Sequence, residues 1–459
     1  MKQSAQRFVR WFYPGLGVKR WLLVALVGAI LLANGISRWL TAEGMHLQIN
    51  EAIDNFVDDF MSPSLVAPIF LVAGAVLIFF GIRQWMRSIV SALTPEAKDR
   101  IVDALFDMRL RRGYKIVAIG GGTGLSTLLR GLKRYTSNLT AIVTVSDDGG
   151  SSGRLQKELG VLPPGDIRNC LVALADDEAL VTDLFRYRFN EGESLSGHSF
   201  GNLFLAAMSG VTGDFDAAVK ASSRVLNIKG RVLPATLATT RLRATLADGT
   251  VVEGETNISS APSPIADIAL SPSDPAPLAE AIAAIREAHA IVLGPGSLFT
   301  SILPNLLVPG IAREIAAANC TKVYVCNVMT QPGETDSFTA SAHVGALLHH
   351  AGARVFETVI VNEQAPERLL GAYALEGQVP VAVDRAAVEG FGVRFVPASV
   401  ISETETVRHD PQKLAEVVLR LIDESVADRA SLLRLPLSAA ARSSTLHSAE
   451  GAVSPPLSS

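Results

Sequence analysis

The stretch that decides the fold is YKIVAIGGGTGLSTLLRGL, residues 114–132. An apolar run leads into a glycine-rich turn and then into apolar residues at helical spacing, which predicts the strand, turn and helix of an α/β nucleotide site. Leu125 stands where a dinucleotide fingerprint has its third glycine, and no Gly-Lys-Ser/Thr follows. Exposed N–H groups at a helix N-terminus suit a phosphate, although a turn without a ligand shows the same spacing. The candidate ligand-binding residues here are Gly121, Gly122, Thr123 and Gly124.

Between residues 113 and 429 strand patterns alternate with helix patterns. We therefore predict an α/β fold, a Rossmann-like, mostly parallel sheet with helices on both faces. The expected strands are 115–119, 140–146, 289–293, 322–328, 357–362 and 393–397. Residues 239–256 alternate apolar and polar side chains around an Asp-Gly turn, which predicts a small antiparallel hairpin insertion. Residues 410–424 predict a late helix.

Two apolar segments precede this domain, about 21–40 and 64–82, and each is long enough to cross a bilayer. Lysine and arginine flank the pair on both sides, whereas the charges between the segments are acidic. By the positive-inside rule, both ends face the cytoplasm and the connecting loop lies outside. We predict that residues 1–94 form a two-helix membrane hairpin that holds the main domain at the cell membrane, in the cytoplasm. A signal peptide or two buried core helices are the alternatives.

The remaining segments and the composition narrow the class of protein. Residues 95–112 predict an amphipathic connector, lying either on the inner leaflet or against the domain, and residues 430–459 predict a disordered tail. Of the 459 residues, 48% are hydrophobic, and the net charge of −4 indicates no nucleic-acid partner. The three cysteines include no C-x-x-C pair, so a disulfide framework or zinc knuckle is not expected.

The sequence VSDDGGSSGRL follows the second expected strand, where α/β folds often place a ribose-binding acid. Asp147 and Asp148 are candidates for holding Mg²⁺ or a substrate hydroxyl, and for catalysis if the protein is an enzyme. Ser151, Ser152 and Arg154 are candidates for contacting an anion. The alternative is a solvated acidic turn that caps a helix.

Two further helices are expected within 163–175 and 197–210. Apolar residues at helical spacing predict one buried stripe on each helix and place Asn169 and Asn202 on the opposite faces. The stripe expected on the second helix is Phe200, Leu203, Phe204 and Ala207. Both asparagines are therefore candidate ligand-binding residues.

Charged side chains stand near the starts of these two helices. Asp166 and Arg168 are candidates for ligand binding, although Asp166 can equally be an N-cap. His198 is a candidate catalytic acid or base, and a structural role at the helix start is the alternative.

A last pair of polar loops follows two later strands, at 292–305 and 325–338. In the first loop, Gly294, Gly296 and Ser297 present N–H groups and a hydroxyl. The second loop supplies donors and acceptors suited to a sugar or base, from Asn327, Thr330, Gln331, Gly333 and Glu334. Because the carboxyl ends of parallel strands meet at one edge of a sheet, we expect the polar loops to converge there.

Taken together, six motifs resemble those of the bacterial gluconeogenesis-factor family: GGGTGLS, SDDGGSSGRL, PPGDIRNCLVALA, GHSFGNLFLAAM, GPGSLFTSILPNLLV and NVMTQPGET. That family is related to 2-phospho-L-lactate transferase, which helps to build a deazaflavin coenzyme. The resemblance covers roughly 114–425, and the membrane leader lies outside the usual short members of the family.

The resemblance implies a Rossmann-like domain that binds a UDP-sugar such as UDP-N-acetylglucosamine. It also implies a role in cell-envelope synthesis and cell shape during growth on gluconeogenic carbon sources. The GGGTG and GPGS loops would hold the diphosphate, and the DDGG and NVMTQPGET segments would line the cleft. In the related transferases, the acids of DDGG lie where the acceptor and a metal act.

Two functions from different classes fit these expectations. The first is a nucleotide-sugar-binding regulator that the hairpin keeps near membrane steps, with a cell-envelope synthesis protein as partner and a homodimer left open. The second is a phosphotransferase acting on a deazaflavin acceptor, with Mg²⁺ held by Asp147 or Asp148. Neither hypothesis identifies a definite cofactor. We favour the regulator because the residues of the motifs resemble those of the gluconeogenesis-factor family more than those of the transferases.

Overall fold

The computed structural model describes residues 18–42, 63–93, 108–176, 178–192, 194–404 and 406–434. The chain divides into two compact units, Met1–Arg109 and Leu110–Ser459. Most of the predicted connector, the acidic loop between the apolar segments and residues 435–459 lie outside the described residues. Each unit is therefore described by itself.

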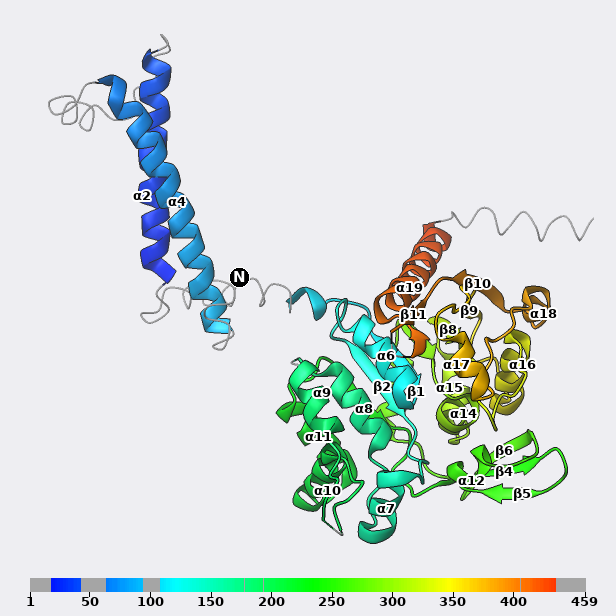
Figure 1. Ribbon diagram of the computed structural model, residues 1–459. Coiled ribbons are helices and arrows are strands. Elements are labelled where there is room, and N and C mark those ends of the chain that lie inside the picture. The colour runs from blue at the N-terminus through cyan, green and yellow to red at the C-terminus, as the bar shows by residue number, and fades with distance from the viewer. Residues whose placement is uncertain are drawn as a thin grey trace, which may run out of the picture. The chain divides into compact units, whose positions relative to one another are not determined.

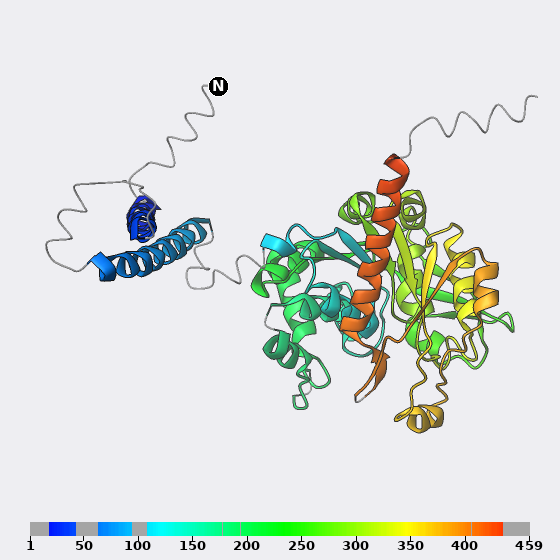
Figure 2. The ribbon, with the colours of Figure 1, turned by 90° about the horizontal axis from the view of Figure 1, so that it is seen from above.

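The first unit contains two long helices, α2 (Val18–Ala42) and α4 (Pro63–Leu93), which lie side by side (Figures 1 and 2). A Cβ atom on Gly28 would lie 2.8 Å from the backbone nitrogen of Ile78, and one on Gly35 would lie 2.9 Å from that of Leu71. Residue numbers rise along one helix as they fall along the other, so the helices are antiparallel. Glycine at the contact lets the two backbones approach closely, as helix pairs in membranes commonly do.

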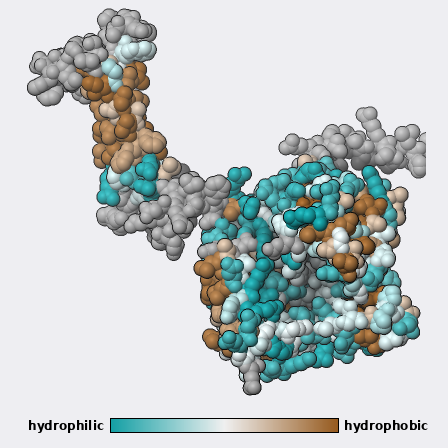
Figure 3. Space-filling view, viewed as in Figure 1, coloured by the Kyte–Doolittle hydropathy of each residue, from teal (hydrophilic) through white to brown (hydrophobic). Residues whose placement is uncertain are grey.

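The outer surface of this helix pair is apolar (Figure 3). Large side chains such as Leu23 and Phe79 are 61% and 71% exposed, whereas Asn34 is buried and donates to the Ile30 carbonyl oxygen at 2.9 Å. Arg20–Ser37 and Val66–Ser88 are long and apolar enough to cross a membrane, by length and composition. Both predicted spans overlap these segments.

The second unit is built on a seven-stranded sheet in the order β10-β9-β8-β7-β1-β2-β3, in which every neighbouring pair is parallel. Its strands are β1 (Ile116–Gly120), β2 (Leu139–Val143), β3 (Arg231–Pro234), β7 (Ala290–Leu293), β8 (Thr321–Val325), β9 (Thr358–Asn362) and β10 (Arg394–Ala398). The chain builds outward from β1 to β3 and then returns to β7, on the other side of β1. The strand order therefore reverses between β1 and β7, and such a switch point is where open α/β sheets bind ligands.

Helices cover both faces of this sheet (Figure 1). Ile116 and Ala118 of β1 belong to a core that also contains residues of α6 (Gly122–Leu132), α8 (Gly165–Leu174), α11 (Phe215–Val225) and α19 (Pro411–Arg434). Three more helices pack onto that layer: α7 (Gly150–Leu159), α9 (Glu178–Arg186) and α10 (Phe200–Thr212).

The opposite face of β1, with Val117 and Ile119, belongs to a second core. Its helical elements are α12 (Glu255–Ser259), α13 (Ala279–Glu287), the π-helix η2 (Leu298–Ile302), α14 (Leu303–Leu306), α15 (Ile311–Ala317), α16 (Ala340–Ala351) and α18 (Arg385–Gly390). A further short helix, α17 (Leu370–Leu375), buries none of its own residues. Alternation of apolar side chains along a strand covered on both sides explains the two cores.

Two small antiparallel sheets complete the second unit. The first has the order β5-β4-β6 and contains β4 (Arg241–Leu246), β5 (Val251–Glu253) and β6 (Ile265–Ser271). The other is a hairpin of β11 (Ile401–Glu403) and β12 (Val407–His409). The predicted insertion hairpin forms β4 and β5, and β6, within a stretch rich in proline and serine, was not predicted.

The predicted fold class, a Rossmann-like α/β sheet with an antiparallel insertion after two apolar helices, is confirmed. All six predicted strands form, whereas the four-residue β3 was not predicted. The tail prediction is wrong for 430–434, because α19 continues to Arg434. The predicted stripe of α10 is also wrong: Leu205 and Ala206 are buried, Ala207 is exposed, and Asn202 points inward with 2% exposure.

Packing of α6 against the start of α19 supplies a test of the fold. A Cβ atom on Gly131 would lie 1.9 Å from the Pro411 carbonyl oxygen, whereas one on Gly210 in α10 would meet no atom within 4 Å. We expect Gly131→Ala to destabilise the protein by at least about 1 kcal/mol, because backbone must move. Gly210→Ala should leave stability unchanged or raise it by up to about 1 kcal/mol. Denaturant unfolding measures both, and equal effects would contradict the packing.

Candidate functional site

The turn between β1 and α6 touches the turn between β7 and η2. A Cβ atom on Gly124 would lie 2.5 Å from the Pro295 carbonyl oxygen, and one on Gly296 would lie 3.3 Å from the Gly121 oxygen. Gly122 and Gly296 also adopt φ angles of 62° and 158°, which glycine reaches at low cost. The contact is therefore made by main chain, and at Gly124 a side chain has no room.

A pocket of about 500 Å³ lies beside these two turns; we call it the carboxyl-edge pocket. The predicted site residues that line it are Gly121, Gly122, Thr123, Gly124, Asp147, Asp166, Gly296, Ser297, Asn327, Thr330, Gln331 and Glu334. They follow the carboxyl ends of β1, β2, β7 and β8, apart from Asp166 at the start of α8. The volume falls within the range of small-molecule sites.

The first turn of α6 faces this pocket. Its N-cap residue, Gly121, has no side chain to accept a hydrogen bond from the helix. The first N–H groups of a helix have no partner within the helix, and they carry partial positive charge. The Gly122 N–H reaches the Asp166 carboxylate, and Thr123 and Gly124 of the same turn also line the pocket.

Three carboxyl groups gather on one side of the pocket: Asp147, Asp166 and Glu255. Asp166 as a residue is half-buried, but its carboxyl lies so close under Gly121 that a Cβ there would be 2.2 Å from Oδ2. Burial, and next the charge of Asp147, raise the pKa of Asp166 to about 7. Burial, and next the charges of Asp147 and Asp166, raise the pKa of Glu255 to about 9. The three acids therefore resist being charged together.

Glu334 closes the pocket next to the second turn and is 8% exposed. Ser297 donates a short hydrogen bond to its carboxylate, and the Thr300 hydroxyl donates to Oε1 at 3.2 Å. Burial raises the pKa of Glu334, and these hydroxyl donors oppose the shift. Glu334 thus fixes the Ser297 hydroxyl in place at the pocket wall.

Asp148 does not line the carboxyl-edge pocket. Its Oδ1 accepts from the Thr256 backbone N–H at 3.1 Å and from the Thr256 hydroxyl at 3.0 Å. The two adjacent aspartates, both candidates for holding Mg²⁺, therefore face different partners. Asp147 points to the pocket, and Asp148 ties the segment after β2 to the first turn of α12.

His198 lies in a buried hydrogen-bond network outside the pocket lining, with 2% exposure. Its Nδ1 is 2.9 Å from the Ser151 hydroxyl, which also accepts from Asn202 Nδ2 at 3.1 Å. Arg168 donates to Asn202 Oδ1 at 2.9 Å. Ser151 therefore links His198 to Asn202 at the start of α10. Burial lowers the pKa of His198.

The remaining predicted site residues shape loops beside the pocket. Arg154 donates to the Ser196 carbonyl oxygen at 2.9 Å, and Asn169 accepts from Arg168 at 2.9 Å. Asn202 Nδ2 also approaches the Ser152 hydroxyl at 3.5 Å. Two predicted glycines fit tight spaces: a Cβ on Gly294 would lie 2.9 Å from Ile302 Cδ1, and one on Gly333 would lie 2.0 Å from the Ser259 oxygen.

Several pocket residues were missed by sequence reasoning: Glu255, Tyr373, Gln378, Arg408 and His409. Glu255 follows the insertion hairpin, and the other four come from late segments with no glycine motif. Burial lowers the pKa of His409 to about 4, so the ring is neutral near pH 7. For Glu255, the signal in the sequence was the glycine directly before it. In the structure, this Gly254 adopts a φ of 95°.

Asp147, Asp166 and Glu255 are chemically suited to a magnesium ion. Mg²⁺ takes oxygen ligands and is commonly held by one or two carboxylates together with substrate phosphates. Burial, and next the charges of the neighbouring acids, raise the pKa values of Asp166 and Glu255, and a divalent cation would offset the repulsion. The donor chemistry of the pocket is therefore of the kind that such an ion takes, and it comes from Asp147, Asp166 and Glu255, whereas Asp148, the other predicted candidate, lies outside the pocket lining.

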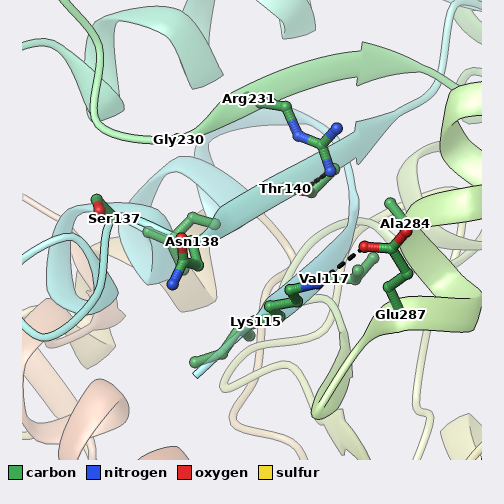
Figure 4. Close-up of a pocket in the computed structure, with 11 residues that line it drawn as sticks. Lys115, Val117, Ser137, Asn138, Thr140, Gly230, Arg231, Ala284 and Glu287 are labelled. Carbon is green, nitrogen blue, oxygen red and sulfur yellow. Dashed lines mark hydrogen bonds and ion pairs between the residues drawn. The ribbon is translucent and has the colours of Figure 1, made fainter. Parts of the chain in front are cut away.

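A second pocket, of about 390 Å³, lies at the amino ends of β1, β2 and β3 (Figure 4). Lys115 Nζ is 2.9 Å from Glu287 Oε2, and Arg231 donates to the Thr140 hydroxyl at 3.1 Å. No glycine turn pair and no group of carboxyl groups lines it. The two edges of the sheet thus differ in chemistry: acids and free amides at one edge, basic side chains at the other.

The fold and the carboxyl-edge pocket define a class: a Rossmann-like α/β protein with a pocket at the switch point of its parallel sheet. The family of 2-phospho-L-lactate transferase CofD matches residues 116–401. Gluconeogenesis factor from Bacillus subtilis is 51% identical over 312 residues, which are 68% of this chain and 98% of that protein. The crystal structure of a Bacillus halodurans protein, 48% identical, has a TM-score of 0.66 and covers 67% of this chain and 100% of its own.

The chain belongs to the gluconeogenesis factor family. A relative from Nostoc sp. is 50% identical over 421 residues, which are 90% of this chain and 92% of that protein. That alignment is longer than the second unit, so it extends into the part that carries α2 and α4.

The raised pKa of Glu255 gives the stability of the protein a pH dependence. The pKa of about 9 in the folded protein lies above the ordinary value of 4.5, so the contribution of Glu255 to stability is fully present below about pH 4.5 and is lost as the pH rises toward 9. Glu255→Gln should therefore be more stable than the natural protein at alkaline pH, with the difference shrinking toward pH 5. Denaturant unfolding across this range measures it. Glu253→Gln, which changes an exposed carboxyl on β5, is the control, and parallel curves for all three proteins would contradict the burial of Glu255.

Proposed function

We propose that this protein binds a UDP-sugar, such as UDP-N-acetylglucosamine, in the carboxyl-edge pocket. Binding would regulate cell shape and envelope synthesis during gluconeogenic growth, through a cell-envelope synthesis protein as partner. The observation that carries the proposal is the main-chain contact between the two glycine turns inside one pocket. The relatives called gluconeogenesis factor support the cellular role.

The pocket has a place for each part of such a ligand. The diphosphate would lie against the amides at the start of α6 and near the Ser297 hydroxyl. Mg²⁺ held by the pocket acids would offset the negative charges of both the diphosphate and the carboxylates. Asn327 and Gln331, which are 3.4 Å apart through Nδ2 and Oε1, would exchange that weak contact for hydrogen bonds to the base or sugar.

Calorimetric titration of the full chain in detergent, with Mg²⁺ present, tests this proposal. We expect UDP-N-acetylglucosamine to bind and Gly124→Val to weaken binding at least about tenfold, or ~1.4 kcal/mol, because the side chain would force the turns apart. Gly210→Ala, in α10, is the control and should bind normally. Equal binding to the Gly124 variant, or a preference for guanine nucleotides, would contradict the proposal.

A second candidate function is phosphoryl transfer to a deazaflavin acceptor. The match to 2-phospho-L-lactate transferase and the three pocket acids favour it. In this reaction, Mg²⁺ held by Asp147, Asp166 and Glu255 would stabilise charge on the transferred phosphoryl group. A pocket carboxylate would accept the proton of the acceptor hydroxyl. Turnover of a deazaflavin acceptor that is lost in Asp147→Asn would favour this function over the regulator.

We also propose that α2 and α4 anchor the protein in the cell membrane, with the second unit in the cytoplasm. Their length, their apolar outer surface and the glycine contact between them support an intramembrane helix pair. The acidic loop and the basic flanks support this orientation.

Membrane anchoring predicts how the protein fractionates. The full chain should stay with membranes after an alkaline carbonate wash and dissolve only in detergent, because two apolar helices hold it. A chain that begins at residue 95 should be recovered in the soluble fraction. Recovery of the full chain without detergent would contradict the anchor.

A further inference from the structure

A histidine in α16 faces a carboxylate of the insertion sheet. The His350 side chain is 5% exposed, and its Nε2 lies 3.3 Å from Oδ1 of Asp267 in β6. Nδ1 of the same ring is 2.8 Å from the Ala346 carbonyl oxygen. A carbonyl oxygen only accepts, so Nδ1 must be the protonated nitrogen. In the neutral ring, Nε2 therefore carries a lone pair.

This arrangement leaves the buried lone pair on His350 Nε2 without a hydrogen-bond donor. The Nε2 atom of His350 is buried and makes no hydrogen bond with any residue that the structure describes. It points instead at a carboxylate oxygen, which also carries lone pairs. Two such acceptors at 3.3 Å repel each other unless a cation or a proton stands between them. A metal ion would satisfy both groups.

A third ligand stands next to this pair. The rings of His349 and His350 are 5.0 Å apart at 89°, and the ligand atoms of His349, His350 and Asp267 all lie within 4.8 Å of one another. Metal–ligand bonds of about 2.0–2.1 Å in a tetrahedral site separate the ligand atoms by roughly 3.3 Å. The observed distance between His350 and Asp267 matches that separation, whereas His349 would need only a small side-chain movement.

We propose that His349, His350 and Asp267 bind a transition-metal ion. Two imidazoles and one carboxylate favour Zn²⁺, Co²⁺, Ni²⁺ or Cu²⁺ over Mg²⁺ or Ca²⁺, which take oxygen ligands. The Ala346 carbonyl orients the ring of His350, as outer hydrogen bonds do for metal-bound histidines. Because His349 and Asp267 are exposed, water can reach the ion and complete the coordination.

The ion would join the insertion to the body of the α/β unit. β6 continues from α12, which carries Glu255, and α16 continues from the segment that carries Glu334. These segments already touch, since the Ser259 hydroxyl donates to Glu334 Oε1 at 3.4 Å. A metal between β6 and α16 would hold together two segments that both reach the carboxyl-edge pocket. The proposal does not depend on which ligand that pocket binds.

Titration of the full chain in detergent with Co²⁺ tests the site, and excess Mg²⁺ is present so that it occupies the pocket acids. We expect one equivalent of Co²⁺ to bind, with visible absorption bands of a nitrogen-ligated ion of low coordination number. Asp267→Asn and His349→Ala should each weaken binding at least about tenfold. His289→Ala, which removes an exposed histidine at the other edge of the sheet, should leave binding unchanged.

A stability measurement covers the case in which a variant folds poorly. Zn²⁺ should raise the thermal unfolding temperature of the natural protein but not that of Asp267→Asn, whose altered side chain is 64% exposed and so tolerates the change. Absence of Co²⁺ binding, or the same affinity in all three variants, would overturn the proposal. That result would leave a protonated His350 paired with Asp267 as the explanation of their contact.

Discussion

The site depends on main-chain contact between two turns at the point where the strand order reverses. β1 and β7 are neighbours although 169 residues lie between Gly120, which ends β1, and Ala290, which begins β7, and their turns touch through Gly124 and Gly296. No side chain can stand between them, because a Cβ on Gly124 would overlap the Pro295 carbonyl. This contact sets the width of the pocket and brings the amides of α6 to face it.

Electrostatic repulsion is the second constraint on this pocket. Asp147, Asp166 and Glu255 lie together in a partly dehydrated space, and burial, followed by the charges of the neighbouring acids, raises the pKa of Asp166 and of Glu255. Glu255 arrives from the antiparallel insertion, which Asp148 holds through Thr256. The insertion is therefore part of the site, and its attachment to the body matters for the pocket as well as for the fold.

The two units solve different packing problems with the same residue. In the helix pair, Gly28 and Gly74 leave no side chain between the helices, so the two backbones approach closely. In the α/β unit, Gly124 and Gly296 leave no side chain between the two turns, so main chain contacts main chain. Glycine thus permits close backbone contact in both units, between helices in the first and between turns in the second.

The sequence by itself determined the features that are local and periodic. The strand, turn and helix of 114–132, the two membrane-length segments and the order of the α/β elements follow from spacing within a few residues. Only the tertiary structure decided that Glu255 enters the pocket, that Asp148 turns to a residue 108 positions away, and that Asn202 is buried. These three features depend on partners that are distant in the chain. Helical spacing predicted that Asn202 faces outward, but its hydrogen bonds to Arg168 and Ser151 outweigh that pattern.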